Sequence, residues 1–170
     1  MKNREVTKQT VGIDIGMESF YACYKVQYAN NSVVIKGIKS FANDTSGMAD
    51  FFTWTEKRNR NPEISLIFVM EATGVYYEEL AYFLHYKKQK VSVQLAQKIK
   101  YFAKSCNLKT KNDKVDSKMI AEFGIEKNLT KTDLWTPPSK NFKTIRDLAR
   151  EHTSLKQSIV EFTPKSEKTR

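Results

Sequence analysis

The chain has 170 residues, 40% of them hydrophobic, so it is long and apolar enough to form a folded domain, and wholesale disorder is excluded. Its formal net charge is +10. Such a field attracts polyanions, of which nucleic acid is the commonest, although many bacterial proteins are simply basic.

Several classes of protein are excluded because cysteine and histidine are few and scattered and the apolar runs are short. Cys23 and Cys106 are far apart and form no paired ligand motif, which argues against a disulfide framework and a zinc site. The 2 histidines exclude a histidine-rich metal site. Residues 1–10 lack the apolar core of a signal peptide, and no apolar run is long enough to span a bilayer. We therefore expect a cytoplasmic protein of the bacterial nucleoid, with no membrane partner.

Three strands are predicted at the start of the chain. Residues 10–16, 19–28 and 33–41 are short segments whose apolar residues alternate or cluster as in strands, and Asn30-Asn31 is a plausible turn because Asn tolerates positive φ. Their short separations predict an antiparallel meander.

Helices and strands then alternate. Asp44, Thr45 and Ser46 offer caps for a helix that ends near residue 57 and buries one apolar face. Residues 64–70 form an unbroken apolar run, which is typical of a central strand covered on both faces. A helix over 76–87, with Tyr76 on its apolar stripe, and a strand over 91–95 follow. The order predicts an α/β fold: a mixed five-stranded sheet with helices on both faces, for which the RNase H-like (RuvC-like) arrangement is the best-known example.

The last third of the chain is predicted to be helical. Residues 97–127 are basic and helical in pattern, and the prolines within 135–138 break the helix. A final helix from about residue 140 has apolar residues at alternating spacings of three and four, which fits a coiled coil, but under three heptads fits a packed terminal helix as well. The predicted organisation is a domain over 1–134, a helical linker or start of a coiled coil over 139–163, and a disordered tail over 164–170. The predicted seam comprises Ile145, Leu148, His152, Leu155, Ile159 and Phe162.

One carboxylate lies within an apolar strand, and a second directly follows another apolar strand. Asp14 lies in an apolar strand, where a charge is costly unless it is paired or binds a metal, and Gly12 and Gly16 on the same face leave room for a phosphate or ion. Glu71 directly follows the strand over 64–70, at the strand end where α/β sheets bind ligands. We expect both carboxylates to project into one crevice. The alternatives are a solvated or lysine-paired Asp14 and a Glu71 that merely complements a helix dipole.

Two further carboxylates lie three residues apart at a predicted helix start. Asp113 can cap that helix, and the spacing puts Asp113 and Asp116 on one face, although acids in a first turn also suit the helix dipole. They interrupt a run of lysines that could contact phosphates or form a solvated helix face. The aromatic residues within this run could stack on bases, but Phe102 is expected to face the core. The lysines are Lys98, Lys100, Lys104, Lys109, Lys111, Lys114 and Lys118.

Four acids in one crevice would favour a hard divalent cation. Oxygen-only ligands suit Mg²⁺ or Mn²⁺, and two such ions about 4 Å apart can stabilise both oxygens of an in-line phosphoryl displacement. No single acid is a specific signal, but the combination predicts a metal-binding site with two ions.

Three segments resemble one known family in order and spacing. They are VGIDIG at 11–16, VMEATGVYYEELAYFL at 69–84, and the stretch from Leu95 to Gly124 that ends KTKNDKVDSKMIAEFG. This pattern resembles the DEDD insertion-sequence transposases, numbered one hundred and ten in the insertion-sequence scheme, which have the Piv-type DNA invertases as relatives. The resemblance covers roughly residues 9–160, and the segment with the paired aspartates is its most specific part.

The resemblance implies a DNA transposase or site-specific recombinase domain. The family's four acids, catalytic and metal-binding, would fall on Asp14, Glu71, Asp113 and Asp116 of a RuvC-like domain that binds magnesium and acts on DNA phosphodiester bonds. It also implies a coiled coil that assembles dimers or higher oligomers. Members of the family use a non-coding guide RNA from the element to choose DNA sites, so RNA is expected as a second partner.

The chain departs from the family in its C-terminal part. Members carry a further domain with a nucleophilic serine, which nothing here matches, and Ser154 and Ser158 do not replace that serine. Asn112 and Ser117 stand where threonine and alanine are common, with little expected effect. The chain would then be an excised domain, a truncated gene product or a natural fragment, and complete recombination by it alone is not expected.

Three other functions fit parts of the pattern. A nuclease of the Holliday-junction resolvase type would share the fold and the acids but cut DNA without a serine partner. A non-catalytic module would only bind nucleic acid or a full-length partner. An actin-like sugar kinase also opens with GIDIG, but the later glycine-rich phosphate loops are missing.

Overall fold

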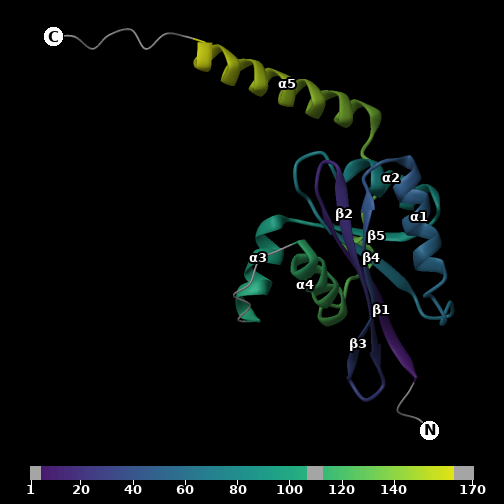
Figure 1. The fold of residues 1–170 in the computed structure, drawn as a ribbon. Coiled ribbons are helices and arrows are strands. Elements are labelled where there is room, and N and C mark those ends of the chain that lie inside the picture. Colours follow the sequence, from purple (N-terminus) through teal and green to yellow (C-terminus); the bar gives the residue numbers. More distant parts are fainter. Residues whose placement is uncertain (1–4, 107–112, 163–170) are drawn as a thin grey trace. The chain divides into compact units, whose positions relative to one another are not determined.

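The computed structural model describes residues 5–106 and 113–162, with the side chains of 160–162 left out of the description. The chain divides into two compact units, Met1–Trp135 and Thr136–Arg170 (Figure 1). The first unit carries the sheet and helices α1 to α4. The second carries the single long helix α5.

Three strands form the predicted antiparallel meander. They are β1 (Val6–Ile15), β2 (Ser19–Tyr28) and β3 (Val33–Ala42), and each pairs with the next in antiparallel register. The turn between β2 and β3 places Asn31 at φ 62°, the left-handed conformation that Asn tolerates. β1 begins four residues earlier than predicted because polar Gln9 is buried there, where it accepts a hydrogen bond from the hydroxyl of Tyr24 at 2.8 Å.

Two parallel strands complete the sheet. β4 (Leu66–Glu71) pairs with β1, and β5 (Lys90–Gln94) pairs with β4. The strand order is β3-β2-β1-β4-β5, with β1 at the centre. Three antiparallel strands followed by two parallel ones make the mixed α/β sheet that the sequence predicts, in RNase H-like order.

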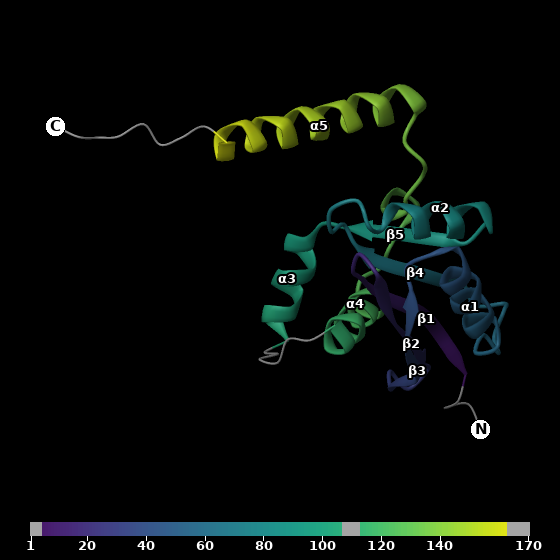
Figure 2. The same cartoon turned by 45° about the horizontal axis from the view of Figure 1, so that its top comes forward.

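Helices cover both faces of the sheet (Figures 1 and 2). α1 (Thr45–Glu56) and α2 (Glu78–Tyr86) lie on one face, where the larger core forms around Phe20, Phe51 and Phe68. α4 (Asp113–Glu126) covers the other face, and α3 (Ala96–Ser105) packs beside it. The smaller core on that face comprises Val69, Ile99, Phe102, Met119, Ile120 and Phe123, so the prediction that Phe102 faces the core is confirmed.

On the first face, the start of α1 agrees with the prediction and the start of α2 does not. Asp44 caps α1 as expected, because its carboxylate accepts a hydrogen bond from Gly47 N at 2.7 Å. α2 begins at Glu78, two residues later than predicted, since Gly74 adopts φ 56° and the chain turns before the helix. Tyr76 was predicted on the buried stripe of this helix. It lies in the preceding loop instead, with 39% of its surface exposed.

The second unit contains α5 (Lys140–Phe162), which begins after the predicted break at Pro137-Pro138. The described residues include no helix long and apolar enough to cross a membrane. The side chain of Phe162 and the tail over 164–170 lie outside the described residues, and the coiled coil stays a prediction. Of the predicted seam, the exposed apolar residues are Ile145, Leu148, Leu155 and Ile159.

Candidate acidic site

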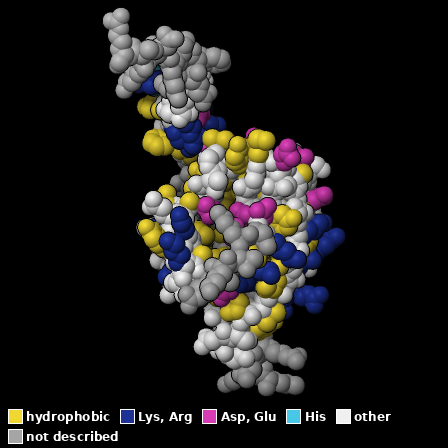
Figure 3. Space-filling view, turned by 60° about the vertical axis from the view of Figure 1, so that its left-hand side comes forward, with side chains coloured by type: hydrophobic (Ala, Val, Ile, Leu, Met, Phe, Trp, Pro, Cys, Tyr) yellow, Lys and Arg dark blue, Asp and Glu magenta, His cyan; other side chains and the backbone are white. Residues whose placement is uncertain are grey.

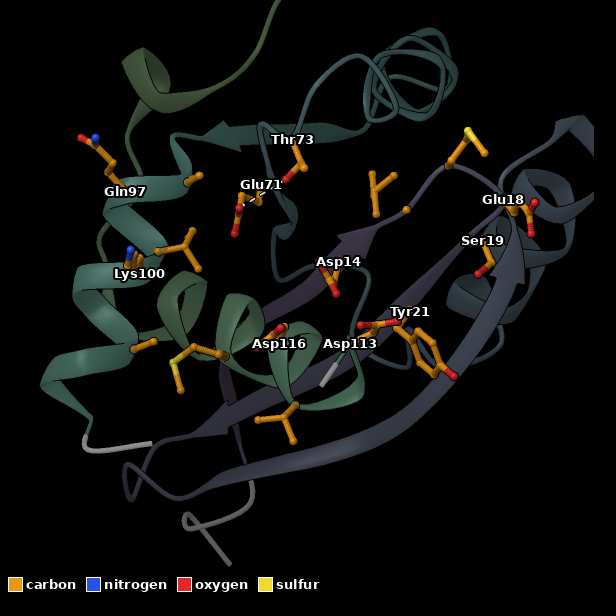
Figure 4. Close-up of a pocket in the computed structure, with 18 of the residues that line it drawn as sticks. Asp14, Glu18, Ser19, Tyr21, Glu71, Thr73, Gln97, Lys100, Asp113 and Asp116 are labelled. Atoms are coloured by element: carbon orange, nitrogen blue, oxygen red, sulfur yellow. Dashed lines mark hydrogen bonds between the residues drawn. The ribbon is translucent and has the colours of Figure 1, made fainter. Parts of the chain in front are cut away.

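The four predicted acids line one cavity of about 940 Å³ at the carboxyl ends of β1 and β4 (Figure 4). Asp14 is the second-last residue of β1, and Glu71 is the last residue of β4. Asp113 and Asp116 lie in the first turn of α4, so Asp113 is part of the helix rather than a residue before it. The chain thus brings together side chains from three elements that are up to 102 positions apart in sequence.

The pleat of β1 decides where Asp14 points. Successive side chains of a strand alternate between faces, so Ile13 and Ile15 enter the larger core while Asp14 and Gly12 face α4. Asp14 is half-buried and lies opposite Tyr21 of β2, which also lines the cavity.

A tight turn holds Glu71 at the end of β4. Ala72 N donates to the carbonyl of Gln94 at 2.8 Å, and Thr73 N donates to the carbonyl of Glu71 at 2.9 Å. The Thr73 hydroxyl donates to the carboxylate of Glu71, with 3.2 Å between Oγ1 and Oε1. The carboxylate therefore has a partner that restricts its orientation beside the cavity.

Gly12 has a different role from the one predicted. A Cβ at this position would lie 2.1 Å from the backbone nitrogen of Ala121 and 2.5 Å from the carbonyl oxygen of Ser117. The prediction that Gly12 leaves room for a phosphate or ion is therefore wrong, because helix α4 occupies that space. The close approach of α4 to β1 brings the first turn of the helix to the side of the sheet that carries Asp14. Gly16, the other predicted glycine, does line the cavity.

A buried ion pair also fixes α4 to the sheet. Lys25 of β2, only 8% exposed, donates to the carboxylate of Glu122 on α4. Beside it, burial raises the pKa of the Cys23 thiol to about 11, an effect that the charges of Lys25 and Lys118 partly oppose. No local pattern in the sequence predicts this pair, although Lys25 shares a strand face with Cys23 and stands out in a largely apolar segment.

The donor chemistry of the cavity fits a hard divalent cation, because all four predicted ligands are carboxylates. Among the described residues, however, no group of three or more His, Cys, Asp or Glu side chains stands close enough to hold a metal ion. The acids thus share a cavity without a finished coordination shell. Their role as metal ligands and catalytic residues stays a prediction.

The predicted lysines divide into three groups. Lys100 and Lys104 of α3 line the cavity, and Figure 4 shows Lys100 on the side of the acids nearest α3. Lys98 and Lys114 are exposed elsewhere on α3 and α4, and Lys118 is half-buried. Lys109 and Lys111 fall outside the described residues.

Charged side chains are unevenly distributed on this side of the molecule. Figure 3 shows acidic side chains in the middle of the face, with basic side chains on both sides. Tyr101, within the lysine run, is 67% exposed, with the Lys104 ammonium 5.9 Å from its ring centre. The cavity also has polar lining residues that no sequence motif predicts: Glu18, Ser19, Tyr21, Thr73 and Gln97.

A family model described as a transposase, of the DEDD IS110 type, matches residues 11–169. The chain belongs to this transposase family. The four acids that line the cavity occur along the chain in the order D-E-D-D, the letters in the name of the family. Membership of this family is consistent with dependence on a divalent metal ion.

Curated relatives of this transposase-family chain are longer than the chain itself. The pilin gene-inverting proteins of Moraxella lacunata and Moraxella bovis are each 28% identical to it over 155 residues. The match covers 91% of the chain and 45% of each relative. The chain therefore spans about half the length of these relatives.

Solved structures with a similar fold include two resolvases. The yeast mitochondrial Holliday junction resolvase Ydc2 has a TM-score of 0.49 and 19% identity, over 69% of the chain and 78% of the resolvase. RuvC of Thermus thermophilus has a TM-score of 0.46 and 8% identity, over 66% of the chain and 90% of RuvC. Both scores are modest, so the strand order of the sheet itself carries the fold assignment.

Proposed function

We propose that this chain is the metal-binding DEDD domain of a DNA transposase or recombinase and acts on DNA phosphodiester bonds during transposition. The observation that carries the proposal is the convergence of four acids from β1, β4 and α4 on one cavity that also has two lysines. Family membership over residues 11–169 supports the same function.

Each group in the cavity would have a separate task. Asp14, Glu71, Asp113 and Asp116 would hold one or two magnesium or manganese ions, which when bound would stabilise the charge that develops on the attacked phosphate. Thr73 would keep the Glu71 carboxylate in one orientation through its hydroxyl. Lys100 and Lys104 would bind backbone phosphates of the DNA.

We propose further that the chain works as part of a larger assembly. The chain spans about half the length of its curated relatives, and full recombination would also draw on residues outside this span. A guide RNA from the element, and association of copies through the apolar stripe of α5, would complete the assembly. Residues 1–134 would then act as the catalytic domain and residues 139–163 as the start of the coiled coil, in the cytoplasm at the nucleoid.

Calorimetric titration of the purified chain with Mg²⁺ and with Mn²⁺ tests the metal site. We expect saturable binding that is lost when Asp14→Asn, Glu71→Gln, Asp113→Asn and Asp116→Asn are combined. The control combines Asp50→Asn with Glu56→Gln, two exposed acids on α1, and should bind the ions as the parent chain does.

Circular dichroism of all three proteins must show the same fold for the comparison to hold. Binding that survives in the fourfold variant would place the ion elsewhere, and the absence of saturable binding to the folded parent chain would contradict a preformed site. Metal-dependent cleavage of branched DNA by the chain alone would favour the resolvase-type alternative over the transposase domain.

A further inference from the structure

Two loops beside the acidic cavity carry three exposed large apolar side chains. Met17, in the loop after β1, is 63% exposed and lines the cavity. Val75 and Tyr76, in the loop after β4, are 48% and 39% exposed. Because β1 and β4 are parallel neighbours, both loops leave the sheet at the edge that carries Asp14 and Glu71. We call Met17, Val75 and Tyr76 the apolar rim.

A single asparagine joins the two loops of the apolar rim. The Asn43 side-chain nitrogen donates to the carbonyl of Gly16 at 3.0 Å and to that of Tyr76 at 3.2 Å. Gly74, at φ 56°, lies so close to Tyr76 that a Cβ there would be 3.7 Å from the ring. These hydrogen bonds hold the two loops side by side, so their apolar residues are exposed at the same end of the sheet.

The surroundings of the apolar rim are asymmetric. Lys100 and Lys104 of α3 lie on one side of the acids, and Figure 4 shows Glu18, the neighbour of Met17, on the other side. A DNA strand could match both sides, because its phosphates are charged and would contact lysines, while the faces of its bases are flat and apolar and would contact the apolar rim. In a regular duplex those faces are stacked on one another, so only an unpaired or unstacked base can offer one to a protein.

We infer that the apolar rim contacts the faces of unpaired bases next to the phosphate that the acids engage, so that the domain prefers DNA with unpaired bases over regular duplex. This inference rests on the proposed function and adds a substrate preference to it. Apolar side chains that insert beside a base step are a known means of holding distorted DNA. The lysines would contribute affinity for any DNA, and the apolar rim would contribute the preference for unpaired bases.

Fluorescence anisotropy with two labelled probes tests the inference. One probe is a regular duplex, and the other is the same duplex with a three-base bulge that contains 2-aminopurine; both are titrated with the full chain in Ca²⁺. We expect the parent chain to bind the bulged probe more tightly. Met17→Ser combined with Tyr76→Ser should weaken binding of the bulged probe about tenfold, with little change for the duplex. The 2-aminopurine emission should change on binding only while the apolar rim is intact.

The matched control is Ile35→Ser combined with Tyr86→Ser, which removes two exposed apolar side chains from β3 and α2. It should retain the preference of the parent chain. Equal affinity of the parent chain for both probes, or an unchanged preference in the Met17/Tyr76 variant, would overturn the inference while leaving the proposed function intact. A parent chain that binds neither probe would count against the proposed function as well.

Discussion

The backbones of Gly12 and Ala121 are in direct contact. A Cβ at Gly12 would lie 2.1 Å from Ala121 N, closer than two non-bonded atoms can come. Helix α4 therefore rests on β1 with no side chain between them at this point. Since Asp14 lies two residues after Gly12 and Asp116 lies about one and a half turns before Ala121, the contact sets how close those two acids can come.

Gly12→Ala should push α4 away from the sheet. We expect the free energy of unfolding to fall by about 3 kcal/mol, because the added methyl group meets backbone atoms that cannot rotate aside. Urea unfolding followed by circular dichroism measures the loss. Gly16→Ala is the control, because its Cβ would meet only the carbonyl of Ser19, at 3.1 Å, and should cost less. Equal losses for the two variants would contradict the close contact.

Removing one charge of the Lys25–Glu122 pair should lower the free energy of unfolding more than replacing both residues with apolar ones. Glu122→Gln leaves the Lys25 ammonium buried without its counter-charge, and we expect a loss of about 2 kcal/mol. This is less than a fully buried pair would lose, because the side chain of Glu122 keeps 25% exposure. Lys25→Met with Glu122→Leu should recover most of the loss. A double-mutant cycle from urea unfolding checks this, and additive losses would argue against a direct pair.

Lys100 and Lys104 should determine how steeply DNA binding depends on salt. Each phosphate contact adds about 0.9 to the slope of log affinity against log salt concentration. We expect Lys100→Ala with Lys104→Ala to lower that slope by about 1 to 2, as measured by anisotropy at several salt concentrations. Lys57→Ala with Arg60→Ala removes the same charge from the loop after α1 and should leave the slope nearly unchanged. An equal drop in the slope for both double variants would indicate that only the net charge of the chain matters.

Asp133 should stabilise the fold in a pH-dependent way. It ends the short 3₁₀ helix η2 (Lys131–Asp133), where its carboxylate accepts hydrogen bonds from the backbone nitrogen and the hydroxyl of Thr130. These bonds lower the pKa of Asp133 below its ordinary value of 3.8, the backbone bond contributing most. A lowered pKa in the folded state means that the stabilisation is present above pH 3.8 and is lost as the pH falls through the folded-state pKa.

Thermal unfolding between pH 7 and pH 3 checks this for Asp133→Asn. The variant should melt below the parent chain near neutral pH, and the gap should narrow as the pH falls below about 4. Asp50→Asn, at an exposed position of α1, should show no such narrowing. A gap that is constant over the whole range would show that the charge of Asp133 does not matter.

The sequence predicted the sheet and the convergence of the acids well, and for a clear physical reason. Strand alternation, turn residues and apolar runs are local signals, and the carboxyl ends of parallel neighbours meet at one edge by geometry. The order of the strands along the chain was therefore enough to place Asp14 and Glu71 together. Asp113 and Asp116 were placed on one helix face by their spacing, but only the folded chain shows that this helix reaches the same cavity.

What the sequence could not show depends on contacts between distant residues. The sequence predicts space for a ligand at Gly12, because a glycine in a strand does not reveal which backbone approaches it. Lys25 and Glu122 are 97 positions apart, and nothing local pairs them. Tyr76 was assigned to a helix by its apolar character, but the turn at Gly74 delays the helix and leaves Tyr76 exposed. The same turn is what places Tyr76 in the apolar rim.

The segment at the end of the first unit also covers part of the edge of the sheet at β5. Trp135 N donates to the carbonyl of Val91 at 2.7 Å, and the hydroxyl of Ser92 donates to the carbonyl of Asp133 at 2.8 Å. An edge strand with open backbone groups is a template on which another chain can add a strand and start aggregation. The residues that lead out of the domain therefore also cover part of this edge, and a strand added at Val91 would first have to displace Trp135.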